Sequence, residues 1–160
     1  MFARVATVSG RVVNFMSKHL PWLGRYGTQR QIKQFRSSGG QKGNKLRGLP
    51  VFLLDVVGRS SGEPRPVMLM LVRRDDDLLV CASNGGNPDA PNWYKNLMAA
   101  GGGHVEVGDE RWAVTARELD DGAERDECWE LLIAGYPDFA SYQELTGRRL
   151  PVVVLERTAA

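Results

Sequence analysis

Three apolar runs in the middle of the chain are separated by segments too short to hold a helix. They cover residues 51–57, 66–73 and 78–83, and turn-forming residues lie between them. Parallel neighbours need a crossover of a dozen or more residues, whereas antiparallel neighbours need only a turn. The runs therefore predict antiparallel strands and disfavour a doubly wound parallel sheet.

The rest of the sequence adds strands and helices to this pattern. Alternating apolar residues on either side of a turn at 108–110 predict a hairpin. A short helix is expected after an N-cap at Asp89. Helical periodicity follows over 120–134 and 140–145, and a last apolar strand is expected over 150–155. About six strands, with helices inserted late, predict an α+β fold built as an antiparallel barrel with peripheral helices.

The first twenty residues carry an amphipathic pattern. Apolar residues over 2–20 recur at helical intervals, and Arg4, Arg11 and Lys18 follow at intervals of seven along one edge of the apolar stripe. Pro21 should end this N-terminal amphipathic helix. Two interpretations remain open: a helix lying on a membrane surface, or a helix packed on the barrel or on a second subunit.

A second short helix and a basic loop are expected before the first strand. Thr28 is a candidate N-cap for a helix that runs through Arg36. The sequence Ser-Ser-Gly-Gly at 37–40 supplies residues that end a helix. Residues 41–49 are then predicted to form a basic loop.

Charge is distributed unevenly along the chain. Residues 1–47 hold ten Lys or Arg and no Asp or Glu, and the first acidic residue is Asp55. We therefore divide the chain into a basic N-terminal helical arm, residues 1–49, and one domain, residues 50–160. Such asymmetry indicates an anionic partner. Nucleic acid is disfavoured because the aromatic residues do not interleave with the basic ones.

Several kinds of site lack their sequence signals. Cys81 and Cys128 have no companions at metal-ligand spacing, so we expect buried, unreactive thiols and no metal site. His19 and His104 lack an evident catalytic partner and receive no catalytic role. Rossmann and P-loop glycine motifs are missing. No run of 18 apolar residues and no secretion signal occurs, which predicts a cytoplasmic protein or one on the cytoplasmic face of a membrane.

The turn between the first two strands, residues 58–65, combines groups that bind anions. Its sequence Gly-Arg-Ser-Ser-Gly-Glu-Pro-Arg places two guanidinium groups and two hydroxyls among glycines. Glycine-rich backbone forms a concave nest of N–H groups, and arginine binds phosphate or carboxylate with two parallel hydrogen bonds. An ordinary polar hairpin is the alternative interpretation.

Two further segments could wall a flat pocket. Residues 83–88 follow the third strand and precede the helix that carries Trp93, so backbone donors could approach a ring system there. Tyr136, Phe139 and Tyr142 are spaced by three in a broken helical pattern. Packing in the core is the alternative for these aromatic residues.

In this order the segments resemble the deazaflavin-dependent nitroreductase and quinone reductase family. The matching residues, within 50–156, are Leu53-Leu54, Gly58-Arg59-x-Ser61-Gly62-x-Pro64-Arg65, Ala82-Ser83-x-Gly85-Gly86, Trp93-Tyr94-x-Asn96-Leu97, Tyr136-Pro137, Tyr142-Gln143 and Pro151-Val152. The N-terminal helix and Gly39-Gly40 are similar to the membrane-associated quinone-reductase branch. The resemblance implies a split β-barrel like that of the FMN-binding pyridoxamine oxidases. It also implies coenzyme F420, an 8-hydroxy-5-deazaflavin, as the cofactor, with FMN less expected.

The resemblance implies roles for individual residues. Arg59, Ser60, Ser61 and Arg65 would hold the anionic tail of F420, with Gly62 in the same turn. The other cofactor-binding candidates are Pro66, Val67, Met68, Leu69, Met70, Cys81, Ala82, Ser83, Asn84, Asn92, Trp93, Tyr94, Lys95, Asn96 and Phe139. The catalytic candidates are Tyr142, Tyr136 and Ser83, and Tyr142 is the favoured proton donor.

Some positions depart from the family pattern. Ser60 stands where Lys or Arg is usual, and Phe139 lacks a hydroxyl that some relatives have. Lys42, Lys45 or Arg47 of the basic arm could offset the charge lost at Ser60.

The activity implied by the resemblance is hydride transfer from reduced F420 to a flat organic acceptor. A quinone is favoured because the basic arm would hold the enzyme where lipid-soluble quinones reside. A nitro- or ene-reductase and a non-catalytic deazaflavin carrier are the alternatives. Both a monomer and a homodimer fit the sequence.

Overall fold

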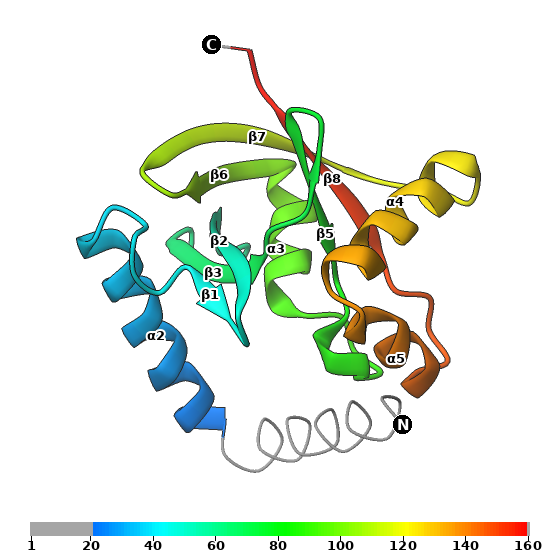
Figure 1. Ribbon diagram of the computed structural model, residues 1–160, viewed down its shortest axis with the longest axis horizontal. Helices are drawn as coiled ribbons and strands as arrows, with labels where there is room; N and C mark the ends of the chain where they lie inside the picture. Colours follow the sequence, from blue (N-terminus) through cyan, green and yellow to red (C-terminus); the bar gives the residue numbers. More distant parts are fainter. Residues whose placement is uncertain (1–20, 160) are drawn as a thin grey trace.

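One antiparallel sheet, bent into a split barrel, forms the centre of the molecule (Figure 1). The computed structural model describes residues 21–159, with side chains from Thr28 onward, and in this part of the chain it holds eight strands and four α-helices. The helix expected over residues 2–20 lies outside the described residues. The helices are α2 Pro21–Ser37, α3 Asn92–Ala100, α4 Ala123–Gly135 and α5 Asp138–Leu145, with a 3-10 turn, η1, at Asn84–Gly86. The strands are β1 Lys45–Leu46, β2 Leu49–Val57, β3 Pro64–Met70, β4 Arg73–Arg74, β5 Asp77–Cys81, β6 Gly102–Val107, β7 Glu110–Glu118 and β8 Val152–Arg157.

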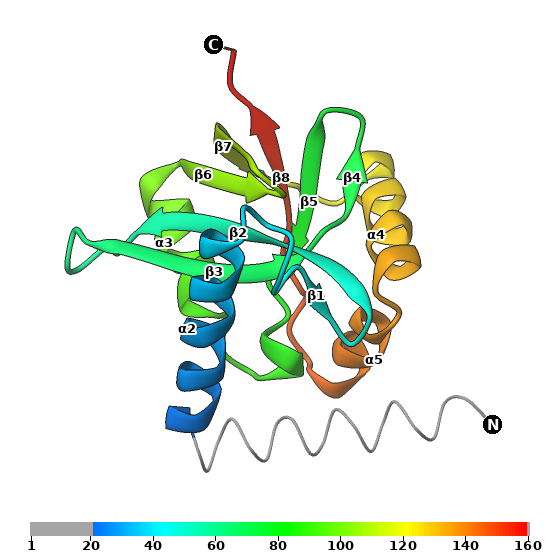
Figure 2. The ribbon, with the colours of Figure 1, turned by 60° about the vertical axis from the view of Figure 1, so that its left-hand side comes forward.

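Every strand pairing in the described part of the chain is antiparallel. The strand order is β1-β2-β6-β7-β8-β5-β4, and β3 pairs with β2 beside this path. The β2–β3 hairpin runs from Val51 opposite Met70 to Val57 opposite Pro64, and Figure 2 shows it crossing the molecule. The predicted antiparallel α+β barrel is thus confirmed, as are the predicted hairpin of β6 and β7 and the last strand, β8.

Both faces of β2 are buried, and the alternation of its side chains explains how. Phe52 and Leu54 lie in the interior of the barrel. Leu53 points to the other face, where it packs with Ile32 and Phe35 of α2. Successive side chains of a strand point to opposite faces, so an apolar run without alternation is what such a strand requires. Each of these burials contributes about 1.5–3 kcal/mol.

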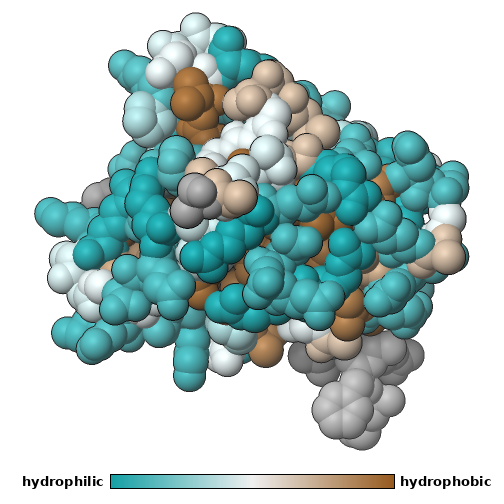
Figure 3. All heavy atoms as spheres, turned by 90° about the horizontal axis from the view of Figure 1, so that it is seen from above, coloured by the Kyte–Doolittle hydropathy of each residue, from teal (hydrophilic) through white to brown (hydrophobic). Residues whose placement is uncertain are grey.

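A second apolar cluster lies where α4 and α5 pack beside β5 and β8 (Figure 1). It joins Cys128 and Leu132 of α4 to Leu79 of β5 and Val154 of β8, all of them essentially inaccessible to solvent. The face of the molecule seen in Figure 3 is mainly hydrophilic, with apolar residues showing between polar ones. Within residues 21–159, no helix has both the length and the apolar character needed to cross a membrane.

Three local predictions are wrong. The helix predicted to start at Thr28 begins at Pro21, so Thr28 lies inside α2 rather than at its N-cap. Proline is well tolerated in the first turn, where backbone N–H groups lack helical partners. The N-cap of α3 is Pro91 and not Asp89. The backbone carbonyl of Asp89 accepts a hydrogen bond from the Asn84 side chain. The loop predicted over 41–49 contains β1, which pairs with the start of β2.

Gly103 of β6 lies at a close approach of β6 to β2. A Cβ atom placed there would lie 2.5 Å from the carbonyl oxygen of Asp55 in β2. We expect Gly103→Ala to lower the free energy of unfolding by about 1–3 kcal/mol, because β6 would have to move away from β2. Urea denaturation measures this change. Gly147→Ala, where the added Cβ meets no atom within 4 Å, is the control. An equal loss in both variants would show that packing against β2 is not the cause.

Candidate active site

The turn between β2 and β3 is fixed to α3 by Arg59. The buried Asn96 side-chain oxygen accepts hydrogen bonds from the Arg59 backbone N–H at 3.2 Å and from its Nη1 at 2.7 Å. Nη2 of Arg59 also donates to Asn92 Oδ1 at 3.4 Å. These partners are neutral amides, and no carboxylate of the described residues forms an ion pair with Arg59. Its positive charge is therefore held in place without being neutralised.

Two further polar side chains of the same turn lie beside Arg59. Ser61 Oγ accepts hydrogen bonds from the Glu63 backbone N–H at 3.2 Å and from Arg65 Nη2 at 3.3 Å, which leaves the Ser61 hydroxyl hydrogen available to donate. Arg65 also lies 3.7 Å from the Glu63 carboxylate, but both side chains are more than half exposed, so this pair is weak. Gly58 has no room for a side chain, since an added Cβ would lie 2.6 Å from Ser61 Oγ. The exposed Ser60 and Gly62 complete the turn.

The strand β3 presents two rows of half-buried side chains. Val67 and Leu69 pack against the interior cluster, whereas Met68 packs under α2 and Met70 against the cluster of α4 and α5. A groove of about 540 Å³ runs between α2 and β3. Its lining residues are Gln29, Ile32, Lys33, Arg36, Ser37 and Pro66. Of the predicted ring-lining residues, Pro66 is the one that reaches this groove.

The loop after β5 packs closely on α5. Asn84, Gly85 and Gly86 all have positive φ, at 46°, 62° and 81°. A Cβ on Gly86 would lie 2.9 Å from the carbonyl oxygen of Tyr142. Only glycine combines this backbone conformation with such an approach at little cost. The contact brings the predicted loop segment and Tyr142 together.

Arg148 is a positioning residue that sequence reasoning did not identify. Its guanidinium donates to the backbone carbonyls of Ala82 at 3.1 Å, Ser83 at 2.9 Å, Asn87 at 2.8 Å and Asp89 at 3.4 Å. Arginine is suited to this task because its five N–H donors have a fixed planar geometry. One side chain thereby fixes the loop that carries Ser83. An arginine in a polar segment has no local signal that predicts such contacts.

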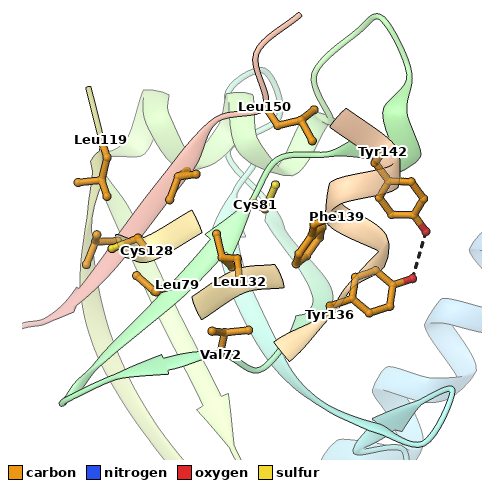
Figure 4. Packing of buried hydrophobic residues seen from close by; sticks show 12 residues of the cluster. Val72, Leu79, Cys81, Leu119, Cys128, Leu132, Tyr136, Phe139, Tyr142 and Leu150 are labelled. Carbon is orange, nitrogen blue, oxygen red and sulfur yellow. Dashed lines mark hydrogen bonds between the residues drawn. The ribbon is translucent and has the colours of Figure 1, made fainter. Parts of the chain in front are cut away.

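Tyr136, Phe139 and Tyr142 form one aromatic cluster, with ring centroids 4.9 to 6.5 Å apart. All three are buried. The hydroxyls of Tyr136 and Tyr142 point toward one another at 3.1 Å, on the side of the cluster that faces α2 (Figure 4). Burial, together with the hydrogen bond to Tyr142, raises the pKa of Tyr136 well above its ordinary value, so this phenol stays protonated at neutral pH. Core packing and a polar edge thus occur in the same cluster.

The end of β5 forms the floor beside this cluster. Cys81, Ala82 and Ser83 are buried, and Cys81 packs with Tyr136 and Tyr142. Burial raises the pKa of the Cys81 thiol to about 12. Both cysteines are free and buried, as predicted. Within residues 21–159 no group of three potential metal ligands comes together.

The site residues predicted on α3 lie in different surroundings. Asn92 and Asn96 face the β2–β3 turn through Arg59, whereas Tyr94 donates its hydroxyl to both oxygens of Glu118 on β7, at 2.9 and 2.8 Å. Burial and this carboxylate raise the pKa of Tyr94 to about 12. Trp93 packs against the interior cluster, and Lys95 is exposed. The geometry therefore brings the two asparagines to the turn and anchors the Tyr94 hydroxyl on β7.

Arg47 lies beside the tyrosine pair. Its Nη1 donates to Asp138 Oδ2 at 3.2 Å and to the Tyr136 hydroxyl at 3.5 Å. We expected Arg47, or a lysine of the same segment, to replace the charge lost at Ser60. The structure instead pairs Arg47 with α5, where Asp138 compensates its charge.

The chain is similar to several known proteins. Residues 28–157 match the model of a family described as F420H(2)-dependent quinone reductase. An F420H(2)-dependent quinone reductase of Mycobacterium tuberculosis strain H37Rv is 33% identical over 126 residues, which are 77% of this chain and 85% of the relative. A solved structure described as an F420-H2 dependent reductase is 40% identical with a TM-score of 0.62, covering 67% of this chain and 94% of that one. Another, described as a domain-swapped dimer, is 34% identical with a TM-score of 0.66, covering 85% and 98%.

The fold and these matches define a split-barrel oxidoreductase. The chain belongs to the F420H(2)-dependent quinone reductase family. Its cofactor is coenzyme F420, as the resemblance implied. The residues of the β2–β3 turn fit such a group, because an uncompensated guanidinium and an available hydroxyl hydrogen suit an anionic tail.

The contacts of Arg148 lead to a test of loop order. We expect Arg148→Met to speed hydrogen exchange at the backbone amides of Gly86 and Asn87, which donate to Ser83 and Asn84, because the carbonyls around them lose their fixed donor. Exchange measured by NMR reports this directly. Arg73→Met, at an exposed position of β4, is the control. Equal exchange at these amides in both variants would contradict the positioning role.

Proposed function

We propose that this protein transfers a hydride from reduced coenzyme F420 to a quinone. The observation that carries the proposal is the buried Tyr136–Tyr142 pair, whose hydroxyls form a polar edge on an aromatic wall in a member of this family. A flat quinone suits such a wall, and its reduction requires a proton besides the hydride. The tyrosine pair would supply that proton.

Bound F420 supplies the hydride, so this chain needs no nucleophile of its own. Arg59, Ser61 and Arg65 would hold the phosphate and carboxylates of the tail. Ser60 would offer its backbone N–H group, and Gly62, whose own N–H donates to the Gly58 carbonyl at 2.9 Å, would shape the turn. The residues proposed to line the ring are Pro66, Val67, Met68, Leu69, Met70, Cys81, Ala82, Ser83, Asn84, Asn92, Trp93, Tyr94, Lys95, Asn96 and Phe139. Their task is to hold the acceptor roughly 3–3.5 Å from the reacting carbon and to exclude water.

Tyr142 would donate the proton to the oxygen of the quinone as negative charge develops there. Tyr136 is the second candidate, and Ser83 would add a polar contact. Burial and the hydrogen bond to Tyr142 hold the pKa of Tyr136 above its ordinary value, so Tyr136 stays protonated until a strongly basic oxygen appears beside the pair.

The activity is tested by the anaerobic oxidation of reduced F420 with menadione, followed by the absorbance of the cofactor. Catalytic turnover is the expected result. Binding of F420 without turnover would indicate a carrier, and faster turnover with a nitroaromatic or an activated alkene would indicate the related reductases. A parallel fluorescence titration with FMN tests the choice of cofactor.

Removing one hydroxyl tests the proton donor. We expect Tyr142→Phe to lower kcat about 100-fold, at the low end of general acid catalysis, and to leave the Kd for F420 nearly unchanged. Steady-state kinetics and a fluorescence titration give both quantities. Thr158→Val, which removes a hydroxyl bonded to the Ala113 carbonyl, is the control. A large loss of F420 affinity at unchanged kcat would assign Tyr142 to cofactor binding instead.

A second variant tests whether Arg59 binds the anionic tail of F420. Arg59→Gln should raise the Kd for F420 roughly 10- to 100-fold, because a charge-assisted hydrogen bond contributes about 1.5–3 kcal/mol. The effect should weaken at high salt. Arg73→Gln removes an exposed charge on β4 and should leave the Kd unchanged. If Arg59→Gln binds F420 as the wild type does, the turn does not hold the tail.

We further propose that the basic arm, residues 1–49, brings the protein to the inner face of the cell membrane, where lipid-soluble quinones are available. Its ten Lys or Arg residues and the amphipathic pattern of residues 2–20 support this proposal. A cytoplasmic protein bound peripherally to the membrane would then meet its substrate at the lipid surface. The relative described as a domain-swapped dimer supports a homodimer.

A further inference from the structure

Arg47 occupies a strained backbone position. It and Gly48 are the central residues of the two-residue turn between β1 and β2, where Leu46 pairs with Leu49, and both have positive φ, at 52° and 78°. Turns of this kind favour Asn, Asp or Gly at the first central position, and arginine there is disfavoured. Strain held at one residue is a reason to look for a function of its side chain.

The Arg47 side chain extends from this turn to α5 and the tyrosine pair. One N–H of Nη1 donates to Asp138 Oδ2 at 3.2 Å, and another donates to the Tyr136 hydroxyl oxygen at 3.5 Å. Tyr136 in turn lies 3.1 Å from the Tyr142 hydroxyl. A guanidinium and two phenols therefore follow one another in a single hydrogen-bonded series.

We infer that Arg47 sets the direction of proton donation in this series, from Tyr136 to Tyr142 and from Tyr142 to the quinone. A guanidinium has only donors, so Tyr136 must accept from it. A phenol that accepts from a cation becomes a better donor, and its own hydrogen is then directed to Tyr142. The Tyr142 hydrogen is left for the quinone. This inference rests on the proposed function.

The proton transfers balance. The quinone that has received a hydride takes a proton on oxygen as the Tyr142 O–H bond breaks. The Tyr142 oxygen takes the Tyr136 proton, and Tyr136 regains a proton from water. In the interval a negative oxygen on Tyr136 lies beside the Arg47 guanidinium. Burial and the Asp138 carboxylate oppose this anion and Arg47 favours it, as the opposite signs of their effects on the pKa of Tyr136 express. The partly exposed Arg47 side chain lies where water can reach this end of the series.

The variant Arg47→Asn distinguishes a role of Arg47 in proton donation from a role in stabilising the fold. Asparagine suits positive φ better than arginine, so the melting temperature should hold or rise, while kcat falls roughly 5- to 20-fold at unchanged Kd for F420. Arg47→Lys keeps a charged donor and should recover part of the lost kcat. Asp138→Asn keeps an acceptor for Arg47 and should stay within about twofold of the wild type. A drop in both melting temperature and kcat in Arg47→Asn, or unchanged kcat, would overturn the inference.

An NMR measurement on the full chain, without F420 or quinone, distinguishes this inference from the proposed function. Tyrosine labelled with ¹³C at Cζ gives one resonance for each of the four tyrosines, assigned with Tyr→Phe variants. In Arg47→Asn the Tyr136 resonance should shift and that of Tyr142 should follow, while that of Tyr94 stays in place. Unmoved Tyr136 and Tyr142 resonances would overturn the inference. Shifted resonances in a protein that does not reduce menadione would leave the hydrogen-bonded series intact and reject quinone reduction.

Discussion

The strand β2 is the element on which the site depends. It pairs with β1, β3 and β6 and is buried on both faces, so its nine residues are held rigidly. One arginine lies just beyond each of its ends: Arg47, beside the tyrosine pair, and Arg59, beside α3. At about 3.3 Å per residue, the strand separates the two turns by at most roughly 30 Å. That length suits a ligand with a flat ring at one end and an anionic tail at the other.

The larger elements were predictable from the sequence because each has its own local pattern. Long apolar runs gave β2, β3 and β5, and alternation around a turn gave β6 and β7. The elements that were not predicted have no such pattern. A two-residue strand such as β1 has no period to detect. The start of α2 was placed wrongly at Thr28 because a good capping residue inside a helix looks the same in sequence as one at its end.

The site was predictable in its parts but not in its connections. The spacing of Tyr136, Phe139 and Tyr142 indicated a cluster, and the structure brings their rings together. Pro137 breaks the helix between the first and second of these residues, which lets the two hydroxyls meet. The contacts of Arg47 join segments up to 91 residues apart in sequence, and those of Arg148 join segments up to 66 residues apart. Such contacts depend on the complete fold, so no local sequence motif predicts them.

The burial of the cysteines has a consequence for a protein that handles quinones. Quinones are electrophiles that alkylate thiols, and the thiolate is the reacting form. Cys81 lies against the aromatic wall itself, yet burial raises its pKa to about 12, so the thiol stays protonated at pH 7. Burial likewise raises the pKa of Cys128. The chain has no other cysteine, so burial keeps both of its thiols in the form that reacts slowly with quinones.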